Sequence, residues 1–320
     1  MIRSTAKAIF DRAGGLKCIR WLNRRRLRIL MYHRFADRAA LARQCEHIRA
    51  WYQPVAMHAA ADWLEGRAAL PPYAVAVTVD DGYRDFLEAG HPIFAEYGIP
   101  VTVYLVTDFL DGKSWLWFDR VVQAFLVARV GEAAVEMPGG KALTFTLDSE
   151  AARRAAGQRV ADLAVSWSAA ERSALVERLP RLLRAELPAR APAEFQPLAW
   201  DDVRRLAERG VEFGAHTRSH PILSAVADPA ELRGEIAGSK ARIECELQKP
   251  VLHFCYPNGK MPDIGPVVME AVRAAGMRTA VTAEPGLNTA RQDAFLLRRI
   301  GTDPGHEQMY FARGLAGLRG

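Results

Sequence analysis

The regular alternation of short apolar runs with amphipathic stretches constrains the fold of this chain most strongly. The apolar runs, each five to seven residues long, are residues 27–32, 73–79, 100–106, 211–215, 251–255, 278–282 and 295–300. Helical patterns fall near residues 41–51, 84–97, 202–209, 229–247 and 264–275. Such alternation predicts a parallel α/β sheet with helices outside it, and seven strands suit either a closed barrel or an open doubly wound sheet. The 320 residues are long enough for one large α/β domain.

One region departs from this alternation. It begins with an aromatic-rich helix start (Trp115, Trp117 and Phe118), continues with a turn signal at residues 138–140, and ends in Ala-, Arg- and Leu-rich helical sequence. We therefore expect a mostly helical insertion at about residues 113–197, between the third and fourth strands. The three aromatic side chains either stack on a sugar ring or form the core of the inserted helix.

Polar side chains cluster directly after three of the predicted strands. The second strand ends in TVDDG (residues 78–82), the fourth is followed by HTRSH (residues 216–220), and the first ends in Tyr32-His33-Arg34. In α/β barrels the carboxyl ends of the strands meet at one face, and catalytic groups come from several of them. The three clusters therefore predict one active site.

The residue types in these clusters are those of a catalytic metal site. His216 and His220 are four residues apart, so both imidazoles would point the same way from a helical turn and share a cation, to which Asp81 would add an oxygen ligand. Two histidines and a carboxylate leave positions open for water and substrate. Asp80 and Asp81 would repel each other in one cleft unless one bound the cation, which leaves the other as a base.

These motifs resemble those of a known family. TVDDG, HTRSH and FCYPNG (residues 254–259) are similar to the first three motifs of the polysaccharide deacetylase family, also called the NodB homology group or carbohydrate esterase family 4. The resemblance covers about residues 27–302. It implies a distorted (β/α)7 TIM-like barrel and a divalent metal, commonly Zn²⁺, that activates water against an N-acetyl group. It also implies that Asp80 is the base and that Asp81, His216 and His220 are the metal ligands.

The third motif departs from the family pattern. The family usually has Arg-x-Pro-Tyr where this chain has Cys255, Tyr256, Pro257 and Asn258, so the arginine that steadies the base is absent from its usual place. Arg299, at the end of the seventh strand, is the candidate substitute. We expect the residues after Cys255 to line the substrate and oxyanion site, with a backbone amide as the oxyanion donor. Cys255 is expected to be a small buried residue rather than a nucleophile.

The general acid must come from elsewhere, because the late Leu-x-His motif of many members is not recognisable. His306 lies beyond the seventh strand and has no strand behind it. Residues 30–33, Leu-Met-Tyr-His, are similar to the exopolysaccharide (poly-N-acetylglucosamine) deacetylase branch, in which a first-strand histidine is the acid. His33 is therefore the candidate acid, and a structural histidine is the alternative.

The positive charge is confined to the start of the chain. Nine basic residues and a single acid precede residue 29, whereas the remainder has 34 basic and 36 acidic residues. Residues 1–26 form a basic, amphipathic segment ahead of the barrel at residues 27–320, and either lie on an anionic membrane through residues 1–28 or pack on the fold. No signal peptide or membrane-spanning run is recognised, which favours the cytoplasm with peripheral contact at the inner membrane face. The near-neutral remainder argues against nucleic-acid binding.

The predicted function is that of a metal-dependent carbohydrate N-deacetylase, a hydrolase of C–N bonds other than peptide bonds. Its substrate would be an N-acetylhexosamine-containing glycan or a lipid-linked glycan precursor. A sugar deformylase or another amidohydrolase would use the same metal site. A barrel that binds carbohydrate without catalysis is the alternative outside the enzymes, and the intact Asp-Asp and His-x-x-x-His patterns argue against it.

Overall fold

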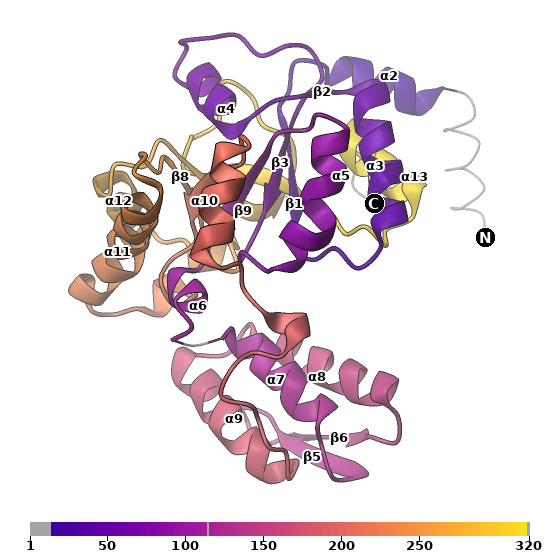
Figure 1. Cartoon of the computed structure of the whole chain (residues 1–320), viewed down its shortest axis with the longest axis vertical. Coiled ribbons are helices and arrows are strands. Elements are labelled where there is room, and N and C mark those ends of the chain that lie inside the picture. The colour runs from indigo at the N-terminus through magenta and orange to yellow at the C-terminus, as the bar shows by residue number, and fades with distance from the viewer. Residues whose placement is uncertain (1–13, 114, 319–320) are drawn as a thin grey trace.

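Seven parallel strands form a closed barrel in the computed structural model, which describes residues 14–113 and 115–318 (Figure 1). The barrel strands are β1 (Arg28–Tyr32), β3 (Ala74–Val79), β4 (Val101–Leu105), β7 (Glu212–Ala215), β8 (His253–Cys255), β9 (Thr279–Pro285) and β10 (Leu297–Gly301). Each pairs with the next in this order, and β10 pairs back with β1. The two-residue strand β2 (Gln53–Pro54) adds to β3 from outside the ring. The closed barrel is therefore the correct one of the two predicted arrangements.

Helices cover the outside of the barrel, as the alternation predicts (Figure 1). They are α3 (Arg38–Trp51), α4 (Met57–Leu64), the π-helical turn η1 (Phe86–Gly90) with α5 (His91–Glu96), α6 (Thr107–Leu110), α10 (Trp200–Glu208), α11 (Pro229–Leu247), α12 (Pro266–Ala274) and α13 (Gln308–Ala316). Short 3-10 turns, η3 (Leu223–Ala225) and η4 (Met261–Asp263), lie in the connections. The five predicted helices are confirmed, and α4, α6 and α13 are additions to them.

Small side chains leave room inside the barrel for a few large ones. Every residue of β3, whose sequence is AVAVTV, is buried, because the strand faces helices on one side and the barrel interior on the other. The ring of Tyr104 fills the interior beside Gly214, where a Cβ atom would lie 2.5 Å from that ring. A packed interior of this kind makes the barrel a rigid support for the loops at its ends.

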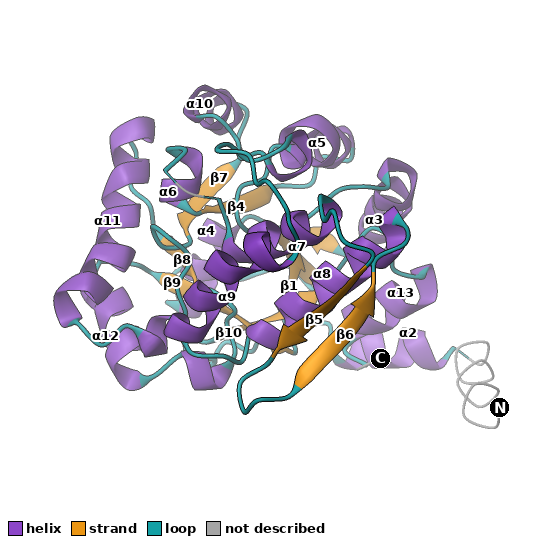
Figure 2. Cartoon of the chain, turned by 90° about the horizontal axis from the view of Figure 1, so that it is seen from below, coloured by secondary structure: helices purple, strands orange, loops and turns teal. Residues whose placement is uncertain are grey.

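The segment between β4 and β7 has a hydrophobic core of its own. It contains α7 (Trp117–Leu126), the antiparallel strands β5 (Glu132–Glu136) and β6 (Ala142–Thr146), α8 (Glu150–Ala164), α9 (Ala169–Leu182) and the turn η2 (Ala193–Phe195). The hairpin turns through Gly139 and Gly140, both with positive φ, as the turn signal predicts. Figures 1 and 2 show this segment lying across one end of the barrel. The domain boundaries drawn from the sequence stay predictions.

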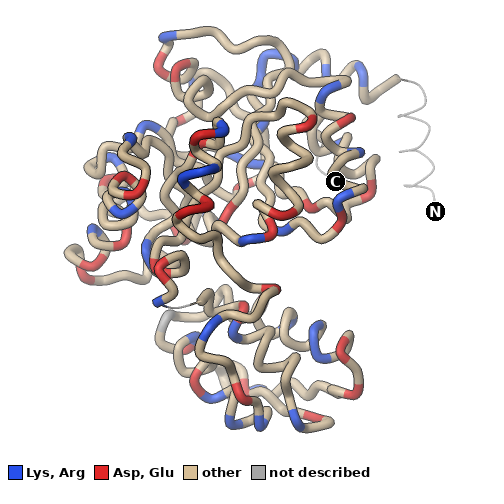
Figure 3. Tube along the Cα trace, viewed as in Figure 1, with Lys and Arg blue, Asp and Glu red and all other residues tan. Residues whose placement is uncertain are grey.

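The amphipathic N-terminal segment is described only in part, because residues 1–13 lie outside the described residues. Helix α2 (Gly15–Leu22) begins after Gly14, which has a φ of 81°, and it contacts α13. Trp21 and Leu22 at its end are exposed. No helix between residues 14 and 318, residue 114 aside, is long and apolar enough to cross a membrane. Over the rest of the chain, positive and negative side chains are interspersed (Figure 3).

Candidate active site

A tight turn after β3 places two adjacent carboxylates at the mouth of the barrel. The Asp80 amide donates to the carbonyl of Tyr32 at 2.9 Å, and the Gly82 amide donates back to the carbonyl of Asp80 at 2.9 Å. Asp81 and Gly82 both have positive φ, and a Cβ atom at position 82 would lie 2.8 Å from the side chain of Leu105. Glycine is therefore required at position 82, and both carboxylates are fixed and only 2% exposed.

The two histidines of HTRSH converge from an irregular loop, so the helical turn predicted for them is wrong. Strand β7 ends at Ala215, and Thr217 and His220 in the following loop have φ values of 68° and 61°. The ring centroids of His216 and His220 nevertheless lie 4.8 Å apart, with the rings nearly perpendicular. The spacing brings the imidazoles together through left-handed backbone rather than through a helix.

Glu235 of α11 holds this loop in place, and the sequence analysis did not identify it. Its carboxylate accepts hydrogen bonds from the backbone amides of Arg218 and Ser219, both at 2.9 Å, and from the Ser219 hydroxyl at 2.8 Å. The His220 amide donates to the Thr217 hydroxyl at 3.0 Å. A buried carboxylate that satisfies two loop amides supports the histidines without touching them.

Asp81, His216 and His220 make a three-residue donor set that fits a divalent cation. Asp81 Oδ1 lies 3.5 Å from His216 Nε2 and 3.6 Å from His220 Nε2. His216 Nδ1 donates to the Cys255 carbonyl at 2.7 Å, which leaves the Nε2 lone pair facing Asp81. His220 Nδ1 is buried without a hydrogen-bond partner among the described residues. One carboxylate oxygen and two imidazole nitrogens are the donor set of catalytic zinc sites.

The acid–base state of these groups also suits a cation. Burial lowers the pKa of His216 to about 4 and that of His220 well below its usual value, so both rings are neutral at pH 7 and their lone pairs are free to bind metal. Burial, and then the charge of Asp80, raise the pKa of Asp81 well above its usual range. A bound cation would offset the burial and the repulsion from Asp80, lower the pKa of Asp81 and keep its carboxylate ionised.

Arg299 on β10 holds Asp80 in a bidentate ion pair. Arg299 Nη1 donates to Asp80 Oδ1 at 2.7 Å and Nη2 donates to Oδ2 at 2.8 Å, while Nε donates to the carbonyl of Thr282 at 2.7 Å. The guanidinium is 1% exposed. Burial alone would raise the pKa of Asp80, but the charge and hydrogen bonds of Arg299 lower it overall. Asp80 is therefore an oriented, ionised carboxylate.

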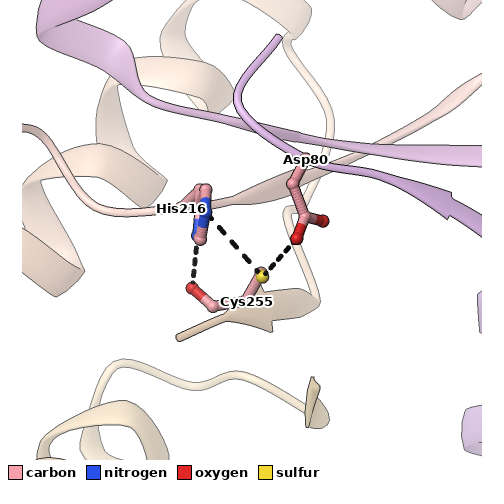
Figure 4. Close-up of side chains that lie close together, drawn as sticks. All are labelled: Asp80, His216 and Cys255. Atoms are coloured by element: carbon pink, nitrogen blue, oxygen red, sulfur yellow. Dashed lines mark hydrogen bonds between the residues drawn. The ribbon is translucent and has the colours of Figure 1, made fainter. Parts of the chain in front are cut away.

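Cys255 occupies the place where the family motif has arginine, and its small side chain leaves room for Arg299. The Cys255 thiol lies 3.5 Å from Asp80 Oδ2, and Arg299 Nη2 lies 3.2 Å from the sulfur. Figure 4 shows the thiol between Asp80 and His216. Burial raises the pKa of the Cys255 thiol well above its usual value, so it is protonated and a poor nucleophile. The guanidinium that approaches Asp80 therefore comes from β10 instead of β8.

Replacement of Arg299 by lysine is expected to lower, by about 10-fold to 100-fold, the kcat of a hydrolysis in which Asp80 is the base. A lysine cannot bond both oxygens of the Asp80 carboxylate, so the base is held less well. With fewer bonds to the carboxylate, the pKa of Asp80 should rise, so the acidic limb of the kcat/KM profile should move to higher pH. Steady-state kinetics of Arg299→Lys across pH measure both effects. Arg291→Lys, an exposed arginine ahead of β10, is the control. A loss of activity with an unmoved pH profile would contradict the positioning role.

His33 lies at the edge of the same cluster. Its Nε2 is 3.7 Å from Asp80 Oδ2, and its side chain is 45% exposed to the cavity above the site. Desolvation by the protein atoms around the ring lowers the pKa of His33, although nearly half of the side chain is open to the cavity, and the nearby charge of Asp80 opposes this shift. His306, the other histidine considered, accepts a hydrogen bond from the Asp303 amide and does not line this cavity.

The residues of the third motif have two roles: one backbone amide pairs with the neighbouring strand, and some of the residues line the cavity. The Tyr256 amide donates to the carbonyl of Val281 at 3.2 Å, so it is not free to bind an oxyanion. Pro257 is buried and does not line the cavity, whereas Tyr256 and Asn258 do. Asn258 has a φ of 58°, and its backbone amide donates no hydrogen bond within the described part of the chain, whereas its side-chain amide donates to Asp263. The backbone amide of Asn258 is therefore the donor that the motif offers to a substrate.

The cavity over these residues has a volume of about 1110 Å³ and is walled partly by the insertion. Trp117 and Phe118 line it, and the ring of Phe118 meets that of His220 edge-on at 5.7 Å. Trp115 does not line it but packs against Phe195, with ring centroids 6.5 Å apart. Two of the three predicted aromatic residues thus face a large open pocket, and the third packs against the main hydrophobic core.

The insertion also contributes a carboxylate that the sequence analysis missed. Asp119 on α7 lines the cavity, is 4% exposed and accepts a hydrogen bond of 2.6 Å from the Tyr83 hydroxyl. Burial raises the pKa of Asp119 to about 7. Asp119 can be identified as a site residue only from its position in the fold, because an aspartate in the first turn of a helix is common in any sequence.

Comparisons with known proteins give a consistent result. The family model described as polysaccharide deacetylase matches residues 67–280. YxkH of Bacillus subtilis, which carries the name of a polysaccharide deacetylase, is 25% identical over 108 residues, spanning 34% of this chain and 37% of that protein. The range that the family model matches, residues 67–280, includes Asp80, Asp81, His216 and His220, but not His33 or Arg299.

Solved structures share the fold. The deacetylase PplD of Streptococcus pyogenes, in complex with acetate, has a TM-score of 0.60 and 14% identity, covering 91% of this chain and 98% of that one. A de-N-acetylase from Aggregatibacter actinomycetemcomitans has a TM-score of 0.59 and 16% identity, and the match covers 90% of this chain and 99% of that one. IcaB from Ammonifex degensii has a TM-score of 0.56 and 17% identity, and the match covers 91% of this chain and 96% of that one.

Proposed function

Because this chain belongs to the polysaccharide deacetylase family, we propose that it is a metal-dependent carbohydrate N-deacetylase. Its substrate would be an N-acetylhexosamine unit of a glycan or of a lipid-linked glycan precursor. The observation that carries the proposal is the ionised Asp80, held by Arg299 beside the donor set of Asp81, His216 and His220. We propose Zn²⁺ as the cation, since that donor set is typical of catalytic zinc.

The chain's own groups account for the proton transfers of amide hydrolysis. A bound divalent cation would polarise the amide carbonyl and acidify water. Asp80 accepts the proton of the attacking water, whose oxygen bonds to the carbonyl carbon, and Arg299 keeps the carboxylate oriented. The backbone amide of Asn258 donates to the oxygen on which negative charge develops. His33, in its protonated form, gives a proton to the nitrogen as the C–N bond breaks, so that acetate and a free amino sugar leave.

Measurement of acetate and formate released from a panel of N-acyl sugars tests the proposal. We expect acetate from N-acetylglucosamine units, because Trp117 and Phe118 offer apolar faces to a pyranose ring in a cavity large enough for more than one sugar. Release of formate alone, from N-formyl sugars, would assign a deformylase instead. Tight sugar binding by the metal-loaded protein with no product would assign a non-catalytic barrel.

Peripheral membrane contact at the cytoplasmic face is a further part of the proposal. Its support is the exposed Trp21 and Leu22 at the end of α2, immediately before the basic residues 24–26. Apolar and cationic side chains together suit an anionic lipid surface. Nucleic acid is not proposed as a partner, because no comparable cationic run occurs outside the first 28 residues.

Replacement of His33 by glutamine should lower kcat on N-acetylglucosamine by about 100-fold, because an amine leaving group must be protonated. The same variant should lose less than about 10-fold on 4-nitrophenyl acetate, whose leaving group departs as an anion. The ratio of the two kcat values in wild type and His33→Gln is the measurement. An equal loss on both substrates would show that His33 is not the acid.

A further inference from the structure

A second cavity adjoins the active-site cavity and opens toward the basic end of α2. Its volume is about 460 Å³, and it lies between the segment after α2, the connection from β9 to β10, and α13. Pro285, Gly301 and Tyr310 line both cavities, so the two are adjacent. These shared residues place the second cavity beside the one that holds Asp80.

The second cavity is positively charged on one side. Arg26 and Arg298 line it, and no aspartate or glutamate does. Neither guanidinium pairs with a carboxylate within the described part of the chain, in contrast to many other arginines of this protein. Two unpaired guanidinium groups in one concave site suit a phosphate or diphosphate group, whose oxygens match their donors.

The start of β10, which carries Arg298, is held by hydrogen bonds and close packing. Asn288 binds the backbone of Arg298 twice, accepting from its amide at 2.8 Å and donating to its carbonyl at 2.9 Å. The aliphatic part of the Arg298 side chain crosses Gly286, where a Cβ atom would lie 2.8 Å from Arg298 Cδ. The backbone of Arg298 is therefore fixed, and its exposed side chain runs along the cavity wall past Gly286.

Apolar residues line part of the rest of the second cavity, beside the polar residues Asn23, Thr302, His306 and Tyr310. Its lining includes the side chains of Leu287, Ile300, Phe311 and Leu318. The exposed Trp21 and Leu22 precede Asn23, which is itself a lining residue. An anionic group held by the arginines would thus have apolar surface beside it, which suits a phosphate ester that carries a hydrocarbon chain.

We propose that the second cavity binds the phosphate or diphosphate of a substrate whose N-acetyl sugar lies over Asp80, with the start of an apolar chain against Leu287 and Phe311. This assignment rests on the proposed deacetylase function and narrows its substrate to a sugar phosphate ester of a lipid. The sugar and the phosphate are adjacent in such a molecule, as the two cavities are in this protein. A free glycan polymer would leave the arginines unpaired.

Direct binding tests the subsite without any chemistry. Calorimetry should show that farnesyl phosphate binds the full chain, and that Arg298→Gln and Arg26→Gln each weaken this binding by about 10-fold to 100-fold. Arg291→Gln, on the same connection but outside the cavity, should bind as the wild type does. Farnesol should bind at least 10-fold more weakly than farnesyl phosphate. Equal binding of farnesol and farnesyl phosphate, or no effect of either arginine variant, would overturn the subsite.

A bilayer headgroup is the other source of a lipid phosphate. Vesicles of phosphatidylcholine with 30% phosphatidylglycerol distinguish the two sources, because a concave subsite should bind monomeric farnesyl phosphate more tightly than it binds the vesicle surface. Binding to these vesicles that depends on Arg298, with no binding of monomeric farnesyl phosphate, would overturn the substrate subsite in favour of membrane docking.

Kinetics separate the subsite from the proposed reaction. The ratio of kcat/KM for N-acetylglucosamine 1-phosphate to that for N-acetylglucosamine should fall by about 10-fold to 100-fold in Arg298→Gln and stay within about twofold in Arg291→Gln. An unchanged ratio in Arg298→Gln, with acetate released from both sugars, would overturn the subsite and leave the deacetylase intact. No acetate from either sugar, with farnesyl phosphate still bound through Arg298, would overturn the deacetylase and keep the subsite.

Discussion

Replacement of Asp80 by asparagine is expected to lower kcat for acetate release by about 10²-fold to 10⁴-fold, the usual contribution of a general base. The substitution keeps the shape of the side chain but removes its ability to take a proton from water. It leaves Asp81, His216 and His220 in place, so zinc binding should persist. The kcat and the zinc content of Asp80→Asn, measured together, separate loss of the base from loss of the site.

The same substitution should also destabilise the protein. Arg299 is buried, and with a neutral partner its charge is uncompensated, which costs about 3 kcal/mol in the free energy of unfolding. Chemical denaturation of Asp80→Asn measures this cost. Asp293→Asn, which breaks a half-exposed pair with Arg273, is the control and should change stability by less than about 1 kcal/mol. Retention of more than about a tenth of the wild-type kcat in folded Asp80→Asn would show that the base lies elsewhere.

Replacement of His220 by alanine is expected to remove zinc and with it the acetate release. Loss of a group that only supports a ligand typically costs 10-fold to 100-fold in metal affinity, so loss of a ligand should cost more than about 100-fold. His220 makes no ring hydrogen bond within the described chain, so its removal breaks no other polar contact of the ring. Equilibrium dialysis against zinc measures the affinity directly.

The matched control for His220 is His58→Ala, an exposed histidine that pairs with Glu212 away from the active-site cavity. It should retain zinc affinity and activity within about twofold. Zinc affinity that is unchanged in His220→Ala would rule out the donor set proposed here. Unchanged acetate release in a variant that no longer binds zinc would rule out the metal dependence.

The strands of the barrel could be predicted because each is a short run of apolar residues buried on both faces. The sequence TVDDG therefore showed where β3 ends and where its carboxylates lie. Arg299 could be found in the same way, since it stands near the end of the last apolar run, where the mouth of a barrel is expected. The bidentate pair with Asp80 is a contact between residues 219 positions apart in the chain, and only the closed barrel reveals it.

The residues that were missed depend on contacts between distant segments. Glu235 supports the histidine loop from the middle of an ordinary helix, and no motif distinguishes it there. Asp119 reaches the site only because the inserted segment lies over the end of the barrel (Figure 2). The Tyr256 amide pairs with β9 because of the register between β8 and β9. The apolar residues of β8 do not determine that register, so this hydrogen bond could not be predicted.

Acetate release as a function of bound zinc tests the central claim most directly. Chelated wild-type protein should release no acetate from an N-acetylglucosamine substrate, and activity should return in proportion to zinc until one ion is bound per chain. Asp80→Asn should take up the same zinc and stay inactive. Acetate release by metal-free wild-type protein, or by zinc-loaded Asp80→Asn at the wild-type rate, would contradict the account.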